Sequence, residues 1–201
     1  MESNKTILYY TSNRENPEFE EKIRRNIVKN CGSLPIISVS QKPIEFGENI
    51  CVGNIGHSYI NEFKQILIGA KQAKTEYLIF AEADFLYPKE YFEFNPTTEN
   101  VYRYDNVWLI FKKTNLCYKK SYSNGASICK REFVVKSLEA YLEKQKLWVD
   151  WKPFEFFRGE TACVSFKTGN GMTRGATFER EKAHVLAHWG NVKELKEKYL
   201  C

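Results

Sequence analysis

The sequence predicts an α/β fold with a mostly parallel central sheet flanked by helices. Short apolar segments rich in β-branched and aromatic residues alternate with segments of helical period through roughly the first ninety residues. Parallel strands need crossover connections, which are normally helical, so this alternation favours a parallel sheet. The length of 201 residues fits one domain with a substantial core.

Strand and helix signals follow one another in the first half of the chain. Three β-rich segments are bounded by turn residues, at 6–11, 34–40 and 77–81. Two segments with apolar residues at helical spacing separate them, at about 17–31 and 59–73. Residues 44–56 are rich in Gly and Asn, which indicates a loop.

The second half has a mixed pattern. Strands are expected at 107–111, around 116–118 and at 161–166, and helices at about 130–144 and 191–200. Residues 124–127 are expected to lead into the first of these helices. The aromatic stretch 148–157 is predicted to be irregular, and the Gly/Thr/Asn-rich stretch 168–177 to be a loop.

Composition narrows the class of protein. A content of 43% hydrophobic and 27% charged residues is typical of globular chains and excludes disordered, collagen-like and coiled-coil classes. No apolar run approaches the roughly 20 residues of a membrane span, and the polar N-terminus lacks a signal-peptide pattern. We therefore expect a soluble, cytoplasmic protein, in the host cytoplasm if it is phage-encoded. The 6 scattered cysteines form no C-x-x-C pair and are expected to be free thiols.

Positive charge is concentrated in the second half. Residues 1–100 carry 11 Lys and Arg against 14 Asp and Glu, whereas residues 101–201 carry 19 against 11. Three basic pairs interleave with aromatic residues: Lys112-Lys113, Lys119-Lys120 and Lys130-Arg131. Cations with aromatics suit a phosphate backbone and an exposed base, so Lys112, Lys113, Lys119 and Lys120 are candidates for binding a polyanionic acceptor. A solvated edge hairpin is the alternative.

Small polar and acidic residues follow the predicted parallel strands. Thr11, Ser12 and Asn13 end the first strand, and Glu82 and Asp84 end the third. Ligands of such sheets bind beyond the carboxyl ends of the strands, where these residues meet. Acids spaced i and i+2 in a bend can face the same side, and a hard cation such as Mg²⁺ or Mn²⁺ takes one or two carboxylates plus phosphate oxygens.

Several segments resemble the nucleotide-sugar half of glycosyltransferases of the GT-A class. They are the first strand with its end at 11–13, the helical segment 58–70 and the third strand with its continuation, 75–88. Asp84 falls where this class has the last acid of its Asp-x-Asp motif, with Glu82 in place of the first acid. Residues 124–127 are similar to the glycine-containing loop near the acceptor site of the class. The resemblance covers about residues 5–130.

This resemblance implies a single GT-A-like, Rossmann-like domain over residues 1–201. Its nucleotide-sugar-binding half would be about 1–95 and its acceptor half about 96–201. The implied reaction moves a hexosyl or pentosyl group from a nucleotide-sugar, with a UDP-sugar favoured, to an acceptor hydroxyl. A divalent cation, Mn²⁺ or Mg²⁺, would stabilise the departing diphosphate. Asp84 and the C-terminal His188 are its expected ligands, with His184 competing.

The donor is expected to contact strand ends, the start of a helix, the acidic motif and two glycine-containing loops. The residues are Thr11, Ser12, Asn13, Ser58, Glu82, Asp84, Gly125 and Arg174. Arg174 lies in a loop of the kind that can close over a diphosphate, although an ordinary exposed loop would have the same sequence character.

An inverting mechanism would also need a carboxylate that deprotonates the acceptor, whereas a retaining one would not use that base. Glu155 and Glu160 lie where the class often carries its base. Glu160 is the predicted base, because it follows a glycine and precedes the start of a helix or strand, and Glu155 or Asp150 could replace it. Surface acids that pair with Arg158 or Lys152 are the alternative.

The acceptor is left open by the sequence. Resemblance to small phage-type transferases suggests a hydroxymethylated pyrimidine in phage DNA, and a duplex acceptor would have to be extruded against aromatic side chains. The candidates are Trp148, Trp151, Phe154, Phe156 and Phe157, which could equally be core residues. A cell-surface saccharide, a lipid or a protein is the alternative acceptor.

Two functions of other classes stay open as well. A nucleotidyltransferase would share the α/β half, but it normally has a Gly-rich loop after the first strand, where this chain has Thr11-Ser12-Asn13-Arg14. A non-catalytic nucleic-acid-binding module would use the basic half and leave Glu82 and Asp84 without a role. The oligomeric state is not indicated by the sequence.

Overall fold

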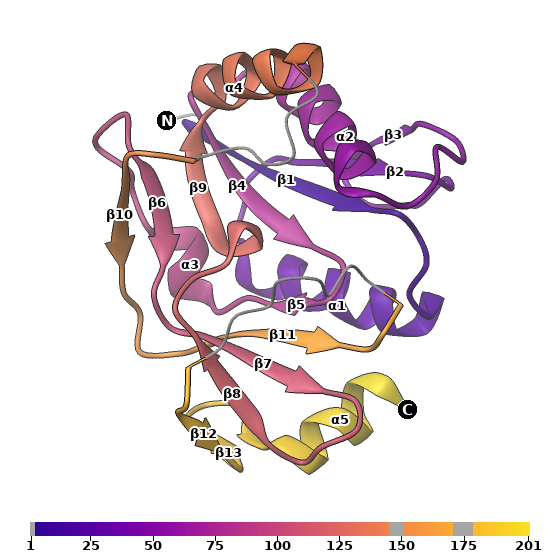
Figure 1. Ribbon diagram of the computed structural model, residues 1–201, viewed down its shortest axis with the longest axis vertical. Coiled ribbons are helices and arrows are strands. Elements are labelled where there is room, and N and C mark those ends of the chain that lie inside the picture. Colours follow the sequence, from indigo (N-terminus) through magenta and orange to yellow (C-terminus); the bar gives the residue numbers. More distant parts are fainter. Residues whose placement is uncertain (1–2, 145–150, 171–178) are drawn as a thin grey trace.

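The computed structural model describes residues 3–144, 151–170 and 179–201. Its centre is a seven-stranded sheet with strand order β10-β6-β9-β4-β1-β2-β3 (Figure 1). The strands are β1 (Lys5–Thr11), β2 (Ile36–Ser40), β3 (Glu48–Cys51), β4 (Tyr77–Glu82), β6 (Val101–Tyr104), β9 (Ser127–Lys130) and β10 (Phe154–Phe157). Neighbours from β4 to β3 are parallel, β9 is antiparallel to both β4 and β6, and β10 is parallel to β6. The predicted α/β fold with a mostly parallel sheet flanked by helices is therefore confirmed.

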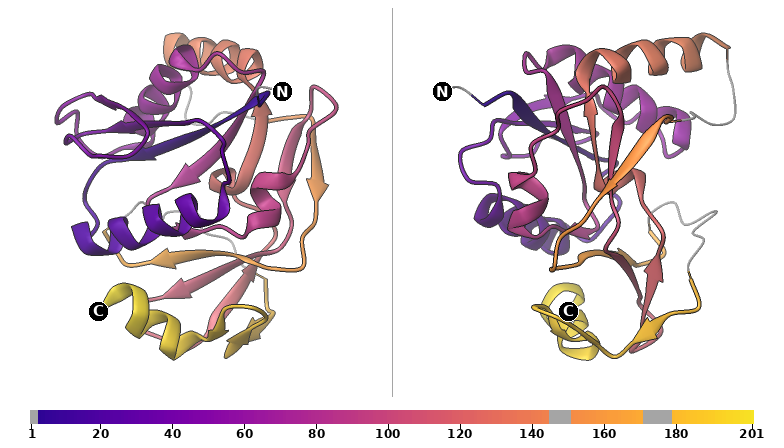
Figure 2. Two further views of the ribbon diagram at one scale, coloured as in Figure 1. Left: turned by 180° about the vertical axis from the view of Figure 1, so that it is seen from behind. Right: turned by 90° about the vertical axis from the view of Figure 1, so that its left-hand side faces the viewer.

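Successive side chains of the buried strands point to opposite faces of this sheet, and each face is covered by helices. Ile7 and Tyr9 of β1 belong to the same core cluster as α1 (Pro17–Asn30), whereas Leu8 and Tyr10 pack with α2 (Tyr59–Gln72) and α4 (Arg131–Lys144). Figure 2 shows α1 on one side of the sheet and α2 with α4 on the other. The fit is close at Gly69 of α2, where a Cβ would lie 2.2 Å from Leu8 Cδ1.

Helix starts follow the capping residues in the sequence. Asn16 caps α1 by accepting from the backbone N–H groups of Glu18 and Phe19, and Pro17 occupies the first turn. The Ser58 hydroxyl caps α2 by accepting from the Asn61 N–H group. Asn191 caps the closing helix α5 (Val192–Leu200) in the same way. These caps place both crossover helices where the periodicity predicts them.

A smaller five-stranded sheet has the strand order β12-β8-β7-β11-β5 and lies below the central sheet in the view of Figure 1. Its strands are β5 (Phe85–Leu86), β7 (Val107–Phe111), β8 (Cys117–Lys120), β11 (Cys163–Lys167) and β12 (Lys182–Ala183). The chain passes from the central sheet into this one at Asp84, between the end of β4 and the start of β5. Asp84 therefore lies at the junction of the two sheets.

Short elements complete the fold. They are α3 (Lys89–Glu93), the 3-10 turn η1 (Asn124–Ala126) and the two-stranded ribbon of β13 (Val185–Leu186) and β14 (Gly190–Asn191) that precedes α5. In the part of the chain that the structure describes, no helix combines the length and apolarity needed to cross a bilayer. All six cysteines are free thiols, as expected.

Three local predictions are wrong. The predicted loop 44–56 contains β3, which adds a parallel strand to the edge of the sheet. Residues 124–127 lead into strand β9 rather than directly into a helix, and α4 follows it. The stretch 148–157, predicted as irregular, contains β10, which pairs with β6; its first three residues lie outside the described part. Each missed strand has only four residues, too few for a periodic signal.

Candidate functional site

Six charged side chains from separate elements meet at the carboxyl ends of β1 and β4. We call them the carboxyl-edge cluster: Glu15, Glu62, Glu82, Asp84, Lys120 and Lys167. Glu82 ends β4, Lys120 ends β8 and Lys167 ends β11. All six members are half-buried, and they lie at the edge where an open α/β sheet binds its ligands, with Glu15 on the loop before α1.

An ion pair between Asp84 and Lys167 is at the centre of this cluster. Lys167 Nζ lies 2.9 Å from Asp84 Oδ2, and the two side chains are only 12% and 16% exposed. The Ser165 hydroxyl lies 3.5 Å from the same oxygen. Burial lowers the pKa of Lys167, but the charges of Asp84 and Glu82 raise it by more. The pKa is therefore raised overall, and this lysine carries a full positive charge.

Strand register produces this pair. β11 runs antiparallel to β5 with Ser165 opposite Phe85, and the Phe166 N–H group donates to the Asp84 carbonyl oxygen at 2.8 Å. Lys167 is the next residue along β11 and therefore reaches Asp84 from a fixed backbone position. The sequence could not indicate this contact, because the partners are 83 residues apart.

Glu82 is held under the η1 turn. The Tyr10 hydroxyl donates to Glu82 Oε1 at 2.9 Å. A Cβ on Gly125 would lie 2.3 Å from Glu82 Cδ, so any larger residue there would force the Glu82 carboxylate to move. The Tyr87 hydroxyl accepts from the Glu82 N–H group and donates to the Gly125 carbonyl oxygen, at 2.9 and 2.6 Å. The structure thus brings together two predicted donor residues, Glu82 and Gly125.

Glu62 was not among the predicted site residues, although it lies in a helix that carries the resemblance. Burial, and then the negative charges of Glu82 and Asp84, raise its pKa to about 8. Lys120 faces the same charges: burial and Lys167 lower its pKa against the opposing effect of Glu82 and Asp84. An acid in the first turn of a helix that starts at the carboxyl edge is the signal that could have identified Glu62.

Two of the predicted residues at the end of β1, Thr11 and Asn13, form hydrogen bonds within the protein. The Thr11 hydroxyl donates to Glu20 Oε1 at 2.9 Å. Asn13 adopts a φ of +53°, and its Oδ1 accepts from the N–H groups of Gln41 and Lys42 at 2.9 and 2.8 Å. These bonds tie the ends of β1 and β2 together and leave half-buried Ser12 between them. The Ser58 hydroxyl is engaged as the α2 cap.

The predicted base residues lie away from the cluster. Glu160 is exposed and precedes β11, whereas Lys167 ends this strand; at about 3.3 Å a residue, β11 alone separates them by roughly 13 Å. Glu155 is exposed on β10 and accepts from the Asn100 side chain. Asp150 and Arg174 lie outside the described residues.

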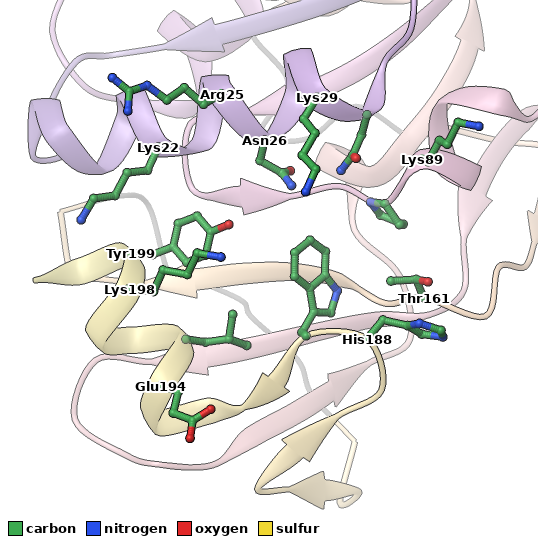
Figure 3. A pocket seen from close by; sticks show the side chains of 14 residues that line it. Lys22, Arg25, Asn26, Lys29, Lys89, Thr161, His188, Glu194, Lys198 and Tyr199 are labelled. Carbon is green, nitrogen blue, oxygen red and sulfur yellow. The ribbon is translucent and has the colours of Figure 1, made fainter.

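His188 occupies the turn between β13 and β14 with a φ of +67°. It lines a groove of about 810 Å³ between α1 and α5, which we call the α1–α5 groove. The basic residues of this groove are Lys22, Arg25, Lys29, Lys89 and Lys198 (Figure 3). Asp84 is not among the residues that line it, so the structure does not bring the two predicted metal ligands together. His184 Nδ1 lies 3.1 Å from the Asn115 carbonyl oxygen.

The described residues do not fit a divalent cation at Asp84. Between residues 3 and 170, apart from 145–150, and from 179 onward, no three His, Cys, Asp or Glu side chains are placed as a metal site. The Asp84 carboxylate is bonded to an ammonium group instead. A metal bound through Oδ2 would have to displace Lys167, and a metal bound through either carboxylate oxygen would lie close to this cation.

The four predicted acceptor lysines do not form one surface. Lys112 and Lys113 are exposed after β7, but Lys119 lies 3.5 Å from Glu181 Oε2, and Lys120 belongs to the carboxyl-edge cluster. Lys119 and Lys120 separate because successive residues of a strand point to opposite faces.

The aromatic residues proposed for base stacking are also divided. Trp151 and Phe157 are core residues. Arg103 lies 4.2 Å from the centroid of the Phe154 ring, and Phe156 is 51% exposed. Trp148 lies outside the described residues. Phe156 is therefore the described member of this group that is most open to a base.

Comparison with known proteins gives similarity to solved structures alone, since no family model and no curated protein matches the sequence. The chain is similar to TarS 1-349 of S. aureus in complex with UDP-GlcNAc, with 10% sequence identity and a TM-score of 0.48 over 84% of this chain and 59% of that one. It is also similar to the bifunctional IspDF of Campylobacter jejuni, with 11% identity and a TM-score of 0.47 over 79% of this chain and 50% of that one. The chain thus spans 50% to 59% of these two structures. The function proposed below depends on the carboxyl-edge cluster.

Proposed function

We propose that this chain is a glycosyltransferase that binds a nucleotide-sugar, with a UDP-sugar favoured, at the carboxyl ends of β1 and β4. The carboxyl-edge cluster is the observation that carries the proposal. It combines two lysines with several carboxylates at the edge where an α/β sheet binds ligands, next to a glycine that lies directly against the Glu82 carboxylate. The resemblance of the Glu82–Asp84 segment to the acidic motif of GT-A enzymes agrees with this placement.

The proposed reaction breaks the bond between the sugar C1 atom and the β-phosphate oxygen. A new bond forms from C1 to the acceptor oxygen, the acceptor proton passes to a base, and the nucleoside diphosphate leaves with the bonding electrons. The leaving diphosphate gains negative charge, which fixed cations in the wall of the site stabilise. The side chains of Thr11 and Asn13 already form hydrogen bonds within the protein. Ser12 and the backbone at the end of β1 would therefore contact the nucleotide.

Glu62 is our candidate for the base. It lies within the cluster, and a pKa of about 8 suits proton acceptance near neutral pH. Glu160, the candidate chosen from the sequence, remains the alternative. An acceptor would have to extend past β11 to reach it.

The acceptor is the second part of the proposal. Lys112 and Lys113 are exposed and suit a polyanion, and hydroxymethylated pyrimidine in phage DNA is the specific candidate. If DNA is the acceptor, its binding weakens steeply as salt rises, and Lys112→Glu with Lys113→Glu reduces that slope. Transfer to a saccharide, lipid or protein that is unaffected by these substitutions would overturn the DNA assignment.

One assay tests the donor. The protein is incubated with UDP-, GDP-, CDP- and dTDP-sugars without acceptor, and the released nucleoside diphosphate is measured. A transferase of this kind hydrolyses one nucleotide class slowly, and Asp84→Asn abolishes the hydrolysis. A parallel reaction with CTP or UTP and a sugar phosphate detects a nucleotidyltransferase through released pyrophosphate. Pyrophosphate release, or DNA binding without turnover of any nucleotide-sugar, would contradict the proposal.

A further inference from the structure

We propose that Lys167, assisted by Lys120, is the built-in cation of the donor site and replaces the divalent metal expected from the resemblance. This inference depends on the proposed function, because it concerns how the same site neutralises the diphosphate of the donor. It predicts that nucleotide binding needs no divalent cation.

The position of Lys167 is fixed by the backbone. The Phe166 N–H group donates to the Asp84 carbonyl oxygen at 2.8 Å, and the Lys167 carbonyl oxygen accepts from the Lys112 N–H group at 3.2 Å. β11 thus lies between β5 and β7, with the Lys167 ammonium 2.9 Å from Asp84 Oδ2. A cation held in this way loses little conformational freedom when an anion binds.

Lys120 supplies a second positive charge from a different strand. Its side chain is half-buried at the end of β8, and its ammonium lies 3.4 Å from the Ser123 hydroxyl. Lys120 and Lys167 repel each other, which is unfavourable in a partly buried site unless anions lie between or beside them. Glu82 and Asp84 offset part of this repulsion in the free protein, and a bound diphosphate would offset more.

In this arrangement Asp84 does not serve as a metal ligand. It holds Lys167 in the site, so it is a positioning residue. A purely structural ion pair would have the same geometry but would not affect nucleotide affinity. The affinity for a nucleotide therefore distinguishes a positioning role of Asp84 from a purely structural ion pair. The dependence of that affinity on a divalent cation distinguishes both from the metal hypothesis.

The experiment measures UDP binding by calorimetry, in EDTA and again with Mn²⁺. For the wild-type chain we expect the two dissociation constants to agree within about twofold. Lys167→Ala should weaken binding in EDTA by about tenfold or more. Because this substitution frees the Asp84 carboxylate, Mn²⁺ should restore part of the affinity, and Lys167→Ala combined with Asp84→Asn should lose that rescue.

Two further measurements keep the result interpretable. Lys29→Ala, at an exposed lysine of the α1–α5 groove, is the matched control and should bind UDP as the wild type does. Manganese binding followed by electron paramagnetic resonance should be absent in the wild type and present in Lys167→Ala. Thermal unfolding checks that each variant is folded.

Three outcomes would overturn the inference. Wild-type binding that requires Mn²⁺ would restore the metal hypothesis while leaving the proposed function intact. Unchanged UDP affinity in folded Lys167→Ala would make the ion pair structural. If wild-type protein binds no nucleoside diphosphate in either condition, the proposed function fails, and this inference fails with it.

Discussion

The carboxyl-edge cluster and the α1–α5 groove both gather several cations, but they hold them in different ways. In the cluster, Lys120 and Lys167 are half-buried and come from strands, and they face acids from other elements. In the groove, Arg25 and Lys89 are exposed and pair with acids of their own helices four residues away. Exposed pairs of that kind contribute little, whereas partly buried charges interact strongly. Burial and the origin of the partners, rather than the number of lysines, therefore mark the candidate site.

A large effect on turnover is expected from Gly125→Ala, because this substitution disturbs the cluster and leaves the groove unchanged. The added methyl group meets the Glu82 carboxylate, which the Tyr10 hydroxyl holds in place, so Glu82 must move. We expect donor turnover to fall by about a hundredfold or more, while the loss of stability stays at about 1–3 kcal/mol. Turnover of the nucleotide-sugar and thermal unfolding measure the two effects. Normal turnover would show that Glu82 does not need its position under the η1 turn.

Glu62→Gln and Glu160→Gln form a pair of variants that tests which of the two acids is the base. Glu62 lies in the cluster and Glu160 is exposed beyond the other end of β11. We expect Glu62→Gln to lower kcat by about 10²- to 10⁴-fold, with Glu160→Gln close to wild type. The reverse order of effects in steady-state assays would return the base to Glu160.

The stability of the cluster should depend on pH through Glu62. Its pKa is raised to about 8 in the folded chain, above its ordinary value of 4.5, so the folded state favours the protonated acid. The stabilisation is complete below about pH 4.5 and is lost as pH rises through about 8. Glu62→Gln should flatten this part of the profile. Chemical unfolding at pH 5, 7 and 9 measures it, and identical profiles for the two proteins would show that Glu62 does not titrate as described.

Charge reversal in the α1–α5 groove should have the smallest effect. Lys22→Glu with Lys29→Glu should change donor affinity by less than about twofold and stability by about 0.5 kcal/mol or less. The double variant is compared with wild type by calorimetry and thermal unfolding. A loss of donor affinity would mean that the groove, rather than the carboxyl edge, binds the nucleotide.

The strands and helices differ in how well the sequence predicts them. β1, β2, β4, α1 and α2 were predictable because each combines a buried face with clear periodicity or a capping residue. β3 was not, since its pattern is half-exposed at the edge of the sheet. The positions of Glu82 and Asp84 at the end of β4 were predictable from the apolar strand before them.

What surrounds those acids depends on register. The ion pair of Asp84 with Lys167 follows from β5, a strand of only 2 residues that no local pattern reveals. The separation of Lys119 from Lys120 follows from the pairing of β8 with β7 and β12. Sequence reasoning therefore located the edge of the sheet but not the cation that occupies it.

Hydrogen–deuterium exchange can locate the bound nucleotide-sugar, which we propose lies at the carboxyl ends of β1 and β4. Exchange is measured across the whole chain with and without a saturating UDP-sugar. We predict slower exchange in peptides covering residues 9–16, 80–86, 117–127 and 163–170, with no change over 18–30 and 192–200. Protection confined to α1 and α5, with none at the carboxyl edge, would contradict it.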